Sequence, residues 1–354
     1  MIRKLTKRSD GVEARVLKPE VSIRKVRYSL EGNSIEFSNG TTEKGTCINC
    51  HSKPCLNLPK NYLNNHIIDG LPHNNDPRVC PVNAISYNGK DGIEINSDCI
   101  GCGLCMTRCP IGGIEYDNYN QSFKVSKTDS EYFVLADSSQ QASVESTYLR
   151  ITEVSKDFHT SKIPLELTNN LQEGLRKKSL RFPDLELIMI RNYLLSLGIK
   201  STISAKGNID SRMDFTAELD EYTIPGESSV QGNDILGLPR RILEDISWLH
   251  NRIGIPKQKQ IPLLIINEFP RKRSDFYEVI SDIENVLGIE IKVLTLHFLF
   301  AMNLFGKKVY KEQLKTSFTI NKNNFDFTPY FRLYIPNIEK IDEAFGSELY
   351  TFSK

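Results

Sequence analysis

The chain carries the run CIGCGLCMTRCP at residues 99–110, in which four cysteines follow the spacing C-x2-C-x2-C-x3-C-P. The other cysteines precede this run, so all eight cysteines of the chain lie within residues 47–109. A thiolate is a soft ligand, and soft ligands select zinc, copper(I) or iron–sulfur centres. Short spacings such as C-x2-C turn several sulfurs toward one centre, so the run predicts a metal or cluster site.

The spacing of this run is the one that bacterial proteins use for iron–sulfur clusters, where the fourth cysteine ligates the other cluster of a pair. The earlier cysteines form a longer version, C-x2-C-x4-C at residues 47–55, followed after a gap by Cys80 and Pro81. We therefore expect two [4Fe–4S] clusters with crossed ligands. The ligands expected for cluster one are Cys47, Cys50, Cys55 and Cys109. The ligands expected for cluster two are Cys80, Cys99, Cys102 and Cys105.

An internal repeat supports the crossed arrangement. The sequence CPVNAISY at residues 80–87 matches CPIGGIEY at residues 109–116 as C-P-x-x-x-I-x-Y. We expect the isoleucine and the tyrosine that end each copy to cover a cluster. Residues 45–120 resemble a bacterial-type ferredoxin with two [4Fe–4S] clusters, and the resemblance implies an α+β ferredoxin-like module.

Three other uses of these cysteines stay open at this point. A disulfide framework needs an oxidising compartment, and nothing in the sequence marks the chain as secreted. Four-cysteine zinc ribbons also use paired C-x2-C motifs, but they need neither a third close cysteine nor the proline that follows. The sequence CINCH at residues 47–51 matches the c-type haem attachment motif, which would take two cysteines from cluster one.

The composition is that of an ordinary globular protein. The formal net charge is +1, so no overall field draws the chain to nucleic acid or to a membrane surface. The basic start, residues 1–8, is not followed by the apolar stretch of a signal peptide, and no segment approaches the roughly 18 apolar residues of a membrane span. We therefore predict a cytoplasmic protein with no membrane partner.

The chain divides into parts of different composition. We expect residues 1–135 to form a ferredoxin domain, with an N-terminal hairpin and the clusters within 47–110. A polar stretch rich in Ser and Gln predicts a linker over residues 136–160, and the cysteine-free residues 161–354 are expected to form an α/β domain. Between the two cysteine groups, residues 56–79 are rich in Asn, Pro and His, which is typical of an inserted surface loop.

The cysteine-free part shows alternating helix and strand patterns. Helices are expected over residues 165–177, 183–197, 235–253 and 274–287. Strands are expected over residues 199–204, 213–219, 222–230, 261–267 and 289–296. A helix between two buried strands requires a right-handed crossover, so the order predicts a mixed central sheet flanked by helices.

This order over residues 183–296 resembles the restriction-endonuclease-like core of the PD-(D/E)XK nuclease superfamily. The resemblance implies a site with Asp214, Glu227 and, on the preceding helix, Glu186. Two such carboxylates could hold Mg²⁺, which polarises a phosphodiester and activates the attacking water. The position of the family lysine holds Ser229, and Pro225 with Gly226 fits poorly inside a central strand.

Two functions therefore remain in competition. The first is an iron–sulfur protein fused to a nuclease-like or nucleic-acid-binding domain, by analogy with bacterial defence, in which basic runs such as residues 176–181 contact phosphate. The alternative is a ferredoxin-type electron-transfer protein that docks to a redox enzyme through its C-terminal domain. Whether the chain is an enzyme depends on which function is right, and Mg²⁺ is expected only for the first.

Overall fold

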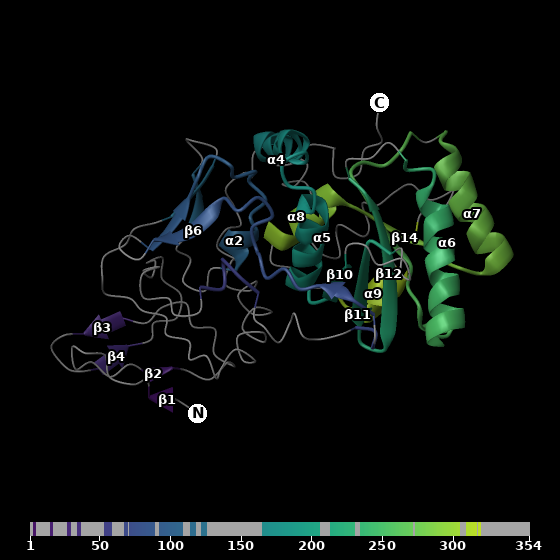
Figure 1. Ribbon diagram of the computed structural model, residues 1–354, viewed down its shortest axis with the longest axis horizontal. Helices are drawn as coiled ribbons and strands as arrows, with labels where there is room; N and C mark the ends of the chain where they lie inside the picture. The colour runs from purple at the N-terminus through teal and green to yellow at the C-terminus, as the bar shows by residue number, and fades with distance from the viewer. Residues whose placement is uncertain are drawn as a thin grey trace.

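The computed structural model describes most of the cysteine region and most of the α/β part (Figure 1). The described residues are 3–4, 15–16, 27–29, 34–36, 53–58, 67–69, 71–88, 92–108, 114–117, 122–125, 165–205, 213–230, 234–271, 273–304, 309–316 and 318–319. Within this part of the chain, no helix is long and apolar enough to cross a membrane. The linker expected over 136–160 lies outside the described residues, so the division of the chain into domains stays a prediction.

A mixed six-stranded sheet in the order β14-β13-β12-β11-β10-β5 forms the centre of the α/β part. Its strands are β5 (His73–Asn74), β10 (Lys200–Ser204), β11 (Phe215–Leu219), β12 (Tyr222–Ser229), β13 (Leu263–Ile266) and β14 (Lys292–Thr295). The strands β12, β13 and β14 are parallel, and the pairs β12–β11, β11–β10 and β10–β5 are antiparallel. The predicted mixed central sheet is confirmed.

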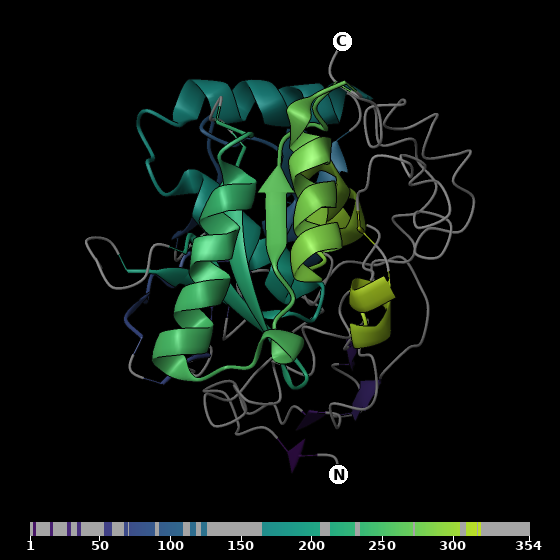
Figure 2. The ribbon, with the colours of Figure 1, turned by 90° about the vertical axis from the view of Figure 1, so that its right-hand side faces the viewer.

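Helices cover both faces of this sheet (Figures 1 and 2). On one side α5 (Leu185–Ser196) contacts β10 and α8 (Leu296–Leu304), and α8 contacts β14. On the other side α6 (Leu238–Trp248) contacts β12 and β13, and α7 (Asp275–Leu287) packs on α6. The remaining helices are α4 (Leu165–Lys178), which packs on α5, a π turn (Leu249–Ile253), a 3-10 turn (Lys257–Lys259) and α9 (Lys311–Thr316).

Local sequence explains where these elements start and stop. The Ser274 side chain accepts the Phe276 N–H at 3.3 Å and caps α7, and Gly288 ends that helix with a φ of 64°. The expected helix over 235–253 starts later, with Pro239 in the first turn of α6. Gly226 fits inside β12 because a Cβ there would lie 2.1 Å from the Phe215 ring, so the close approach of that ring requires a glycine.

The cysteine region is built from two hairpins and a short helix. The first hairpin pairs β6 (Ile85–Asn88) with β7 (Gly92–Ile95), and the second pairs β8 (Ile114–Asp117) with β9 (Ser122–Val125). Each hairpin follows one of the two Cys-Pro pairs, and β7 lies against β9. The one-turn helix α2 (Leu104–Thr107) lies between the hairpins in sequence. Two further short pairs precede this region, β1 (Arg3–Lys4) with β2 (Arg15–Val16) and β3 (Arg27–Ser29) with β4 (Ser34–Glu36).

Of two expectations about this region, one stays a prediction and one is wrong. Tyr87 is 38% exposed and its ring lies under the Lys53 ammonium at 4.0 Å, and its role in covering a cluster stays a prediction. The segment between Cys55 and Cys80 is more than a surface loop, because its strand β5 forms the edge of the sheet beside β10. One continuous core joins the two parts, from Leu58 beside the cysteines to Phe318 beyond α9.

Candidate functional site

Five of the eight cysteines lie in the described part of the chain. They are Cys55, Cys80, Cys99, Cys102 and Cys105. The other three, Cys47, Cys50 and Cys109, lie outside the described residues, so the structure does not test most of the ligand set expected for cluster one. All four residues expected for cluster two can be placed.

Cys80 lies on a tight turn between β5 and β6. The turn is fixed on its amino side by Asp76, whose carboxylate accepts the Arg78 N–H at 2.9 Å and the Arg78 Nε at 2.7 Å. On the other side Asn83 adopts a φ of 55°, which brings the Ala84 N–H to 3.2 Å from the Cys80 sulfur. Burial raises the pKa of the Cys80 thiol. The turn therefore directs the Cys80 sulfur toward the backbone N–H of Ala84.

Glycines shape the second cysteine loop. Gly101 and Gly103 have φ values of 72° and 71°, a left-handed conformation that other residues adopt only with strain. The Gly101 N–H lies 3.5 Å from the Cys99 sulfur, and Gly103 starts α2, which carries Cys105. The left-handed conformations of Gly101 and Gly103 therefore reverse the direction of the chain between the cysteines. This requirement explains why glycines occupy these two positions of the sequence C-x-G-C-G-x-C.

The two loops bring four thiols together. Burial raises the pKa of Cys105 well above its usual range, and negative charge on the neighbouring Cys102, Cys99 and Cys80 raises it further. Burial likewise dominates at Cys102, where Cys80 and Cys99 add to the rise in pKa. Cys80 is thus a neighbour of the three cysteines of the second loop, although 18 residues separate it from Cys99 in the sequence. Cys55 also raises the pKa of Cys105, more weakly.

Helix α5 of the α/β part holds both loops. Arg191, 2% exposed, donates from Nη1 to the Asp76 carbonyl at 2.7 Å. The Asn192 amide donates to the carbonyls of Arg78 at 3.0 Å and Val79 at 2.9 Å, immediately before Cys80. The Tyr193 hydroxyl donates to the carbonyl of Cys102 at 2.9 Å. Three consecutive buried side chains therefore fix the backbone on which the thiols stand.

Helices α4 and α8 complete this support. A Cβ on Gly174 of α4 would lie 2.8 Å from the side chain of Ile100, so α4 approaches the cysteine loop closely. Lys178 of α4 forms an ion pair with Asp98, next to Cys99. On the other side, the Thr107 hydroxyl donates to Asn303 of α8 at 3.1 Å. The α/β part thus contacts the cysteine loop from three helices.

The donor set suits an iron–sulfur cluster. Thiolates ligate such clusters, and backbone N–H groups directed at the sulfurs tune their reduction potential. The sulfurs of Cys80 and Cys99 have such donors, and apolar side chains surround the loops. A buried cation also lies nearby: the pKa of Arg191 is lowered to about 10, by burial first and then by the neighbouring Arg108 guanidinium.

A second buried polar set lies at the opposite side of the sheet, around β12. Asp214 precedes β11 and accepts the Ser228 N–H at 2.8 Å and the Ser228 hydroxyl at 3.1 Å. Burial raises the pKa of Glu227, and the negative charge of Asp214 raises it further, so these two carboxyl groups are neighbours. Glu186 accepts the N–H of Val230, just after β12, at 2.9 Å. The three acids of the nuclease resemblance all lie near the carboxyl end of β12.

Helix α6 adds a cation and a third carboxyl group to this set. The Arg241 Nε donates to Glu227 at 2.7 Å, and its Nη1 donates to Asp234 at 2.9 Å. Burial and the adjacent Glu227 raise the pKa of Asp245. In the described part of the chain, Oε1 of Glu227 and Oδ2 of Asp245 are buried and have no hydrogen-bond partner, so Arg241 is the cation that offsets the negative charge here. The protein itself neutralises much of this acidic set.

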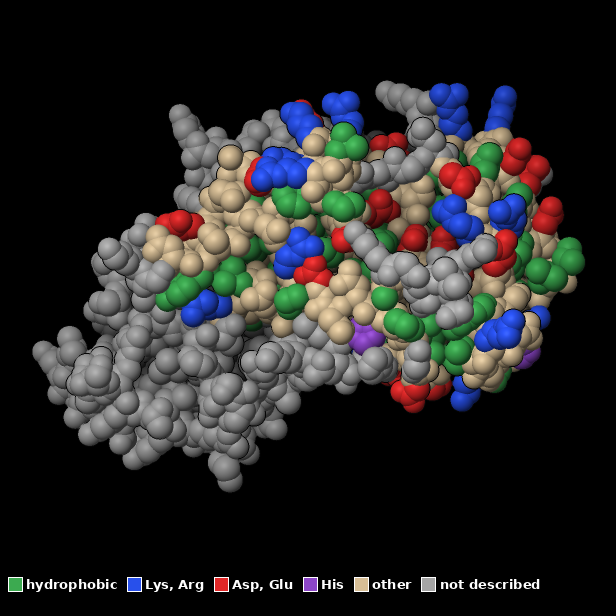
Figure 3. All heavy atoms as spheres, viewed as in Figure 1, with side chains coloured by type: hydrophobic (Ala, Val, Ile, Leu, Met, Phe, Trp, Pro, Cys, Tyr) green, Lys and Arg blue, Asp and Glu red, His purple; other side chains and the backbone are tan. Residues whose placement is uncertain are grey.

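Basic side chains of residues 176–181 form ion pairs within the molecule. Lys178 and Arg181 pair with Asp98, and Lys177 pairs with Glu173 on the same helix. The cation that reaches Glu227 is Arg241 instead. On the face shown in Figure 3, basic and acidic side chains are interspersed over the α/β part. In the described part of the chain, no three His, Cys, Asp or Glu side chains are arranged to hold a single metal ion.

Comparison with protein families supports the cluster assignment in the cysteine region. The 4Fe-4S binding domain family matches residues 93–115, which include Cys99, Cys102, Cys105 and Cys109. This part of the chain is therefore of the iron–sulfur, ferredoxin type. The match covers only one of the two cysteine groups, so the number of clusters stays a prediction.

Curated relatives point the same way. The chain is 28% identical over 141 residues to the probable anaerobic dimethyl sulfoxide reductase chain YnfG of Escherichia coli, covering 39% of this chain and 60% of that protein. It is 38% identical over 69 residues to hydrogenase-4 component A of the same organism, covering 19% and 23%. An uncharacterized ferredoxin of Methanocaldococcus jannaschii is 58% identical over 38 residues, covering 10% and 22%. The chain thus spans at most about 60% of the length of these relatives.

Comparison with solved structures gives a much weaker likeness. The restriction endonuclease FokI matches with a TM-score of 0.28 and 9% identity, covering 59% of this chain and 39% of that one. A TM-score this low carries no argument for a shared fold. The nuclease resemblance therefore rests on the order of elements and on the placement of the acids alone.

Sequence reasoning missed the residues that support the cysteine loops. Arg191 and Asn192 lie at the centre of the mostly apolar helix sequence LELIMIRNYLLS, and these central polar residues were the available signal. Polar side chains at the centre of a buried helix need partners, so they mark a contact with another backbone. Nothing in the sequence around Asn303 or Gly174 identifies their partners in the cysteine region.

Proposed function

We propose that this chain is a ferredoxin-type electron carrier with two [4Fe–4S] clusters, whose α/β part supports the clusters and docks to a redox enzyme. Cys80, Cys99, Cys102 and Cys105 are proposed to ligate cluster two. Cys47, Cys50, Cys55 and Cys109 are proposed to ligate cluster one. The observation that carries the proposal is the gathering of Cys80 with the three thiols of the second loop.

The surroundings of these thiols support one-electron chemistry. When bound, the clusters supply a reversible one-electron couple. The backbone N–H groups of Ala84 and Gly101 stabilise negative charge on the sulfurs of Cys80 and Cys99, which favours the reduced state. Buried apolar residues such as Val79, Ile100 and Leu104 lie in the same loops, Cys102 is buried, and Cys80, Cys99 and Cys105 are half-buried. Reduction then requires little movement, because α5 already holds both loops.

The relatives support an enzyme partner. Two of them are named as a chain of a reductase and a component of a hydrogenase, and we propose that this chain likewise works beside a redox enzyme. No Lys, Arg, Asp or Glu cluster of one sign dominates the face in Figure 3, so docking is expected to use shape and mixed charge.

Protein purified without oxygen tests the proposal. We expect about eight iron and eight sulfide per chain, and a paramagnetic signal from both clusters after reduction with dithionite. Oxidation of the reduced protein by a one-electron oxidant of high potential, such as ferricyanide, should be fast and complete. About four irons with one zinc would show that cluster one is wrong, and clusters that cannot be reoxidised would contradict the electron-carrier role.

A Mg²⁺-dependent nuclease site is the second candidate. The observation in its favour is the proximity of Asp214 and Glu227 at the carboxyl end of β12, where two carboxylates could share one ion. Against it, Arg241 already binds Glu227, which is 2% exposed, and Ser229 stands where the family keeps its lysine. Electron transfer therefore has the stronger support.

A cleavage assay separates the two candidates. The electron-carrier proposal predicts no cutting of plasmid DNA with Mg²⁺, whether the clusters are oxidised or reduced. The nuclease candidate predicts cutting that Asp214→Ala and Glu227→Ala each abolish while the iron content stays unchanged. Binding of nucleic acid without cutting would show as an affinity that falls steeply with salt.

A further inference from the structure

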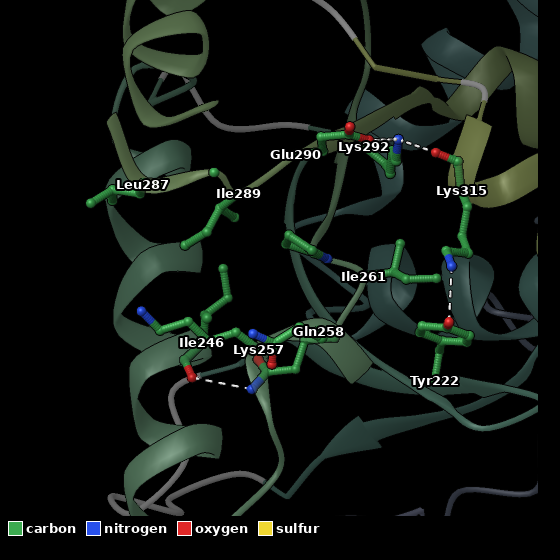
Figure 4. A pocket seen from close by; sticks show the side chains of 13 residues that line it. Tyr222, Ile246, Lys257, Gln258, Ile261, Leu287, Ile289, Glu290, Lys292 and Lys315 are labelled. Carbon is green, nitrogen blue, oxygen red and sulfur yellow. Dashed lines mark hydrogen bonds and ion pairs between the residues drawn. The ribbon is translucent and has the colours of Figure 1, made fainter. Parts of the chain in front are cut away.

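A pocket of about 320 Å³ opens at the amino ends of the parallel strands, at the opposite edge of the sheet from the carboxyl groups around Glu227 (Figure 4). Tyr222 starts β12, residues 260–262 precede β13, and residues 288–291 precede β14. The volume lies at the lower end of the range for small-molecule sites, about 300–1,000 Å³. The pocket is separate from the cysteine loops and from the acidic set.

One wall of this pocket carries a positioned ammonium group. The Lys315 Nζ donates to the Tyr222 hydroxyl at 2.9 Å and lies 4.6 Å from the centre of the Tyr222 ring. These two contacts use one of its three N–H donors, so the others can reach a ligand. The Tyr222 hydroxyl accepts from Lys315 and keeps its own proton to donate.

A buried lysine fixes the backbone beneath this group. The Lys292 Nζ donates to the Lys315 carbonyl at 2.5 Å, to the Thr319 hydroxyl at 2.5 Å and to Glu290 at 2.8 Å. Its three donors are therefore used within the protein, and so is the one carboxylate of the pocket wall. Lys315 is thus held at its carbonyl by Lys292 and at its ammonium by Tyr222, which removes much of the entropy cost of binding through a lysine.

The described residues that line the pocket carry a net positive charge. The ion pair of Lys292 with Glu290 cancels internally, and neither Lys315 nor Lys257 forms an ion pair among the residues that the structure describes. Figure 4 shows Ile246, Leu287 and Ile289 across the cavity from Lys315, with Lys257 and Gln258 beside Ile246. A cationic group that faces apolar side chains suits a ligand with an anionic end and an apolar body.

From this arrangement we infer that the pocket binds a small organic anion, a carboxylate or a phosphate monoester. The anionic group lies between Lys315 and the Tyr222 hydroxyl, and the apolar body lies against Ile246 and Ile289. Two short charge-assisted hydrogen bonds orient the anion. The inference is independent of the electron-carrier proposal, because the pocket lies at the amino ends of β12, β13 and β14, whereas the described cysteine loops contact α4, α5 and α8.

Titration calorimetry on the full, cluster-containing chain tests the inference with three probes: phenyl phosphate, benzoate and inorganic phosphate. We expect phenyl phosphate or benzoate to bind at least fivefold more tightly than inorganic phosphate, because only the first two use the apolar wall. Whichever of the two binds more tightly identifies the anionic group. Lys315→Met should weaken that binding at least tenfold.

The matched control is Lys311→Met. Lys311 lies one turn earlier in α9 and near the same tyrosine ring, but it pairs with Glu221 outside the pocket. This variant should change the affinity less than twofold. Equal losses in the two variants, equal affinity for all three probes, or no heat of binding with any probe would each overturn the inference. Circular dichroism and the iron content should match the parent protein in both variants.

Discussion

The two sides of the central sheet carry different kinds of buried polar chemistry. On the side of α5 and α8, four thiols lie together, and the hydrogen bonds to the sulfurs of Cys80 and Cys99 come from backbone N–H groups. On the side of α6, Asp214, Glu227 and Asp245 lie together with the Arg241 guanidinium. The thiols are arranged to receive a group from outside the chain. The carboxyl groups already have a cationic partner, Arg241, within the chain.

This difference in charge compensation distinguishes the thiols, which form a binding site, from the carboxyl groups, which have a structural role. Buried acids need compensation, and the carboxyl groups obtain part of it from the Arg241 guanidinium. Thiols stay neutral when buried, but as cluster ligands they must lose their protons, and iron then supplies the compensating charge. The predictions below test whether the acidic set is self-sufficient and whether the thiol loops depend on the α/β part.

The largest effect on stability is expected from Arg241→Met. Removing one partner of a buried ion pair typically costs about 3–5 kcal/mol, and we expect about 2 kcal/mol here because the Arg241 side chain is 36% exposed and water can partly replace it. The measurement is the free energy of unfolding by urea at pH 7. Arg240→Met is the matched control: that exposed side chain pairs with Glu244 at 3.5 Å, and its loss should cost less than about 0.5 kcal/mol. Equal costs for the two variants would show that the acidic set does not depend on Arg241.

Gly174→Ala tests the contact of α4 with the cysteine loop. Alanine favours a helix by about 1 kcal/mol over glycine, but the new methyl group would meet Ile100 at 2.8 Å. We expect a net loss of about 1–2 kcal/mol and faster loss of iron to a chelator, because the loop must move. Lys177→Ala, on the exposed face of the same helix, should leave iron release unchanged. A stabilised Gly174→Ala protein with unchanged iron release would mean that α4 does not constrain the loop.

The acidic set also predicts a pH dependence. The pKa of Glu227 is raised above its ordinary value of 4.5, by burial first, so the folded chain holds a proton that the unfolded chain has lost. Its contribution to stability is complete below pH 4.5 and is lost as the pH rises through the folded pKa, at up to about 1.4 kcal/mol per pH unit.

A Glu227→Gln variant makes this contribution measurable. The free energy of unfolding of the parent, relative to the variant, should fall between pH 5 and pH 8. His297 has the opposite sign, because burial lowers its pKa to about 4, but it titrates in both proteins and cancels in the difference. Parallel pH profiles for the two proteins would mean that Glu227 is ionised at all these pH values.

The smallest effect is expected from Tyr193→Phe. The substitution removes the hydrogen bond to the Cys102 carbonyl at 2.9 Å and leaves the ring in place, so we expect a loss of about 1 kcal/mol. The iron content should stay at the parent value while the exchange of the Cys102 loop amides becomes faster. Unchanged amide exchange would show that α5 does not hold this loop through Tyr193.

The sequence predicts the order of elements in the α/β part correctly, from α5 to β14. The prediction was correct because periodicity and capping residues mark these elements. Helix α7 begins after Ser274 and ends before Gly288, and the apolar run at 261–267 contains β13. The helix α8 was missed because residues 296–304 are apolar on all sides and continue directly from β14, so no change of period separates them.

Long-range partners could not be predicted. Strand β5 has two residues, and its pairing with β10 depends on a register that no local pattern specifies. The pairing of Arg241 with Glu227 joins a helix to a strand, and the sequence shows only a basic pair beside Pro239. By contrast, the expectation that Cys80 joins the second loop came from the C-x2-C-x2-C-x3-C-P spacing and was supported by the Cys-Pro repeat. The crossed ligand assignment itself stays a prediction.

The most direct test of the central claim is the iron content of a chain with cluster one removed. A Cys47→Ala/Cys50→Ala background should retain about four iron per chain, held by cluster two alone. Adding Cys80→Ala should remove the remaining iron, whereas adding Cys55→Ala should leave it in place. If Cys80→Ala keeps about four iron and Cys55→Ala loses them, the crossed assignment is wrong, and the gathering of thiols around Cys105 does not mark the ligands of one cluster.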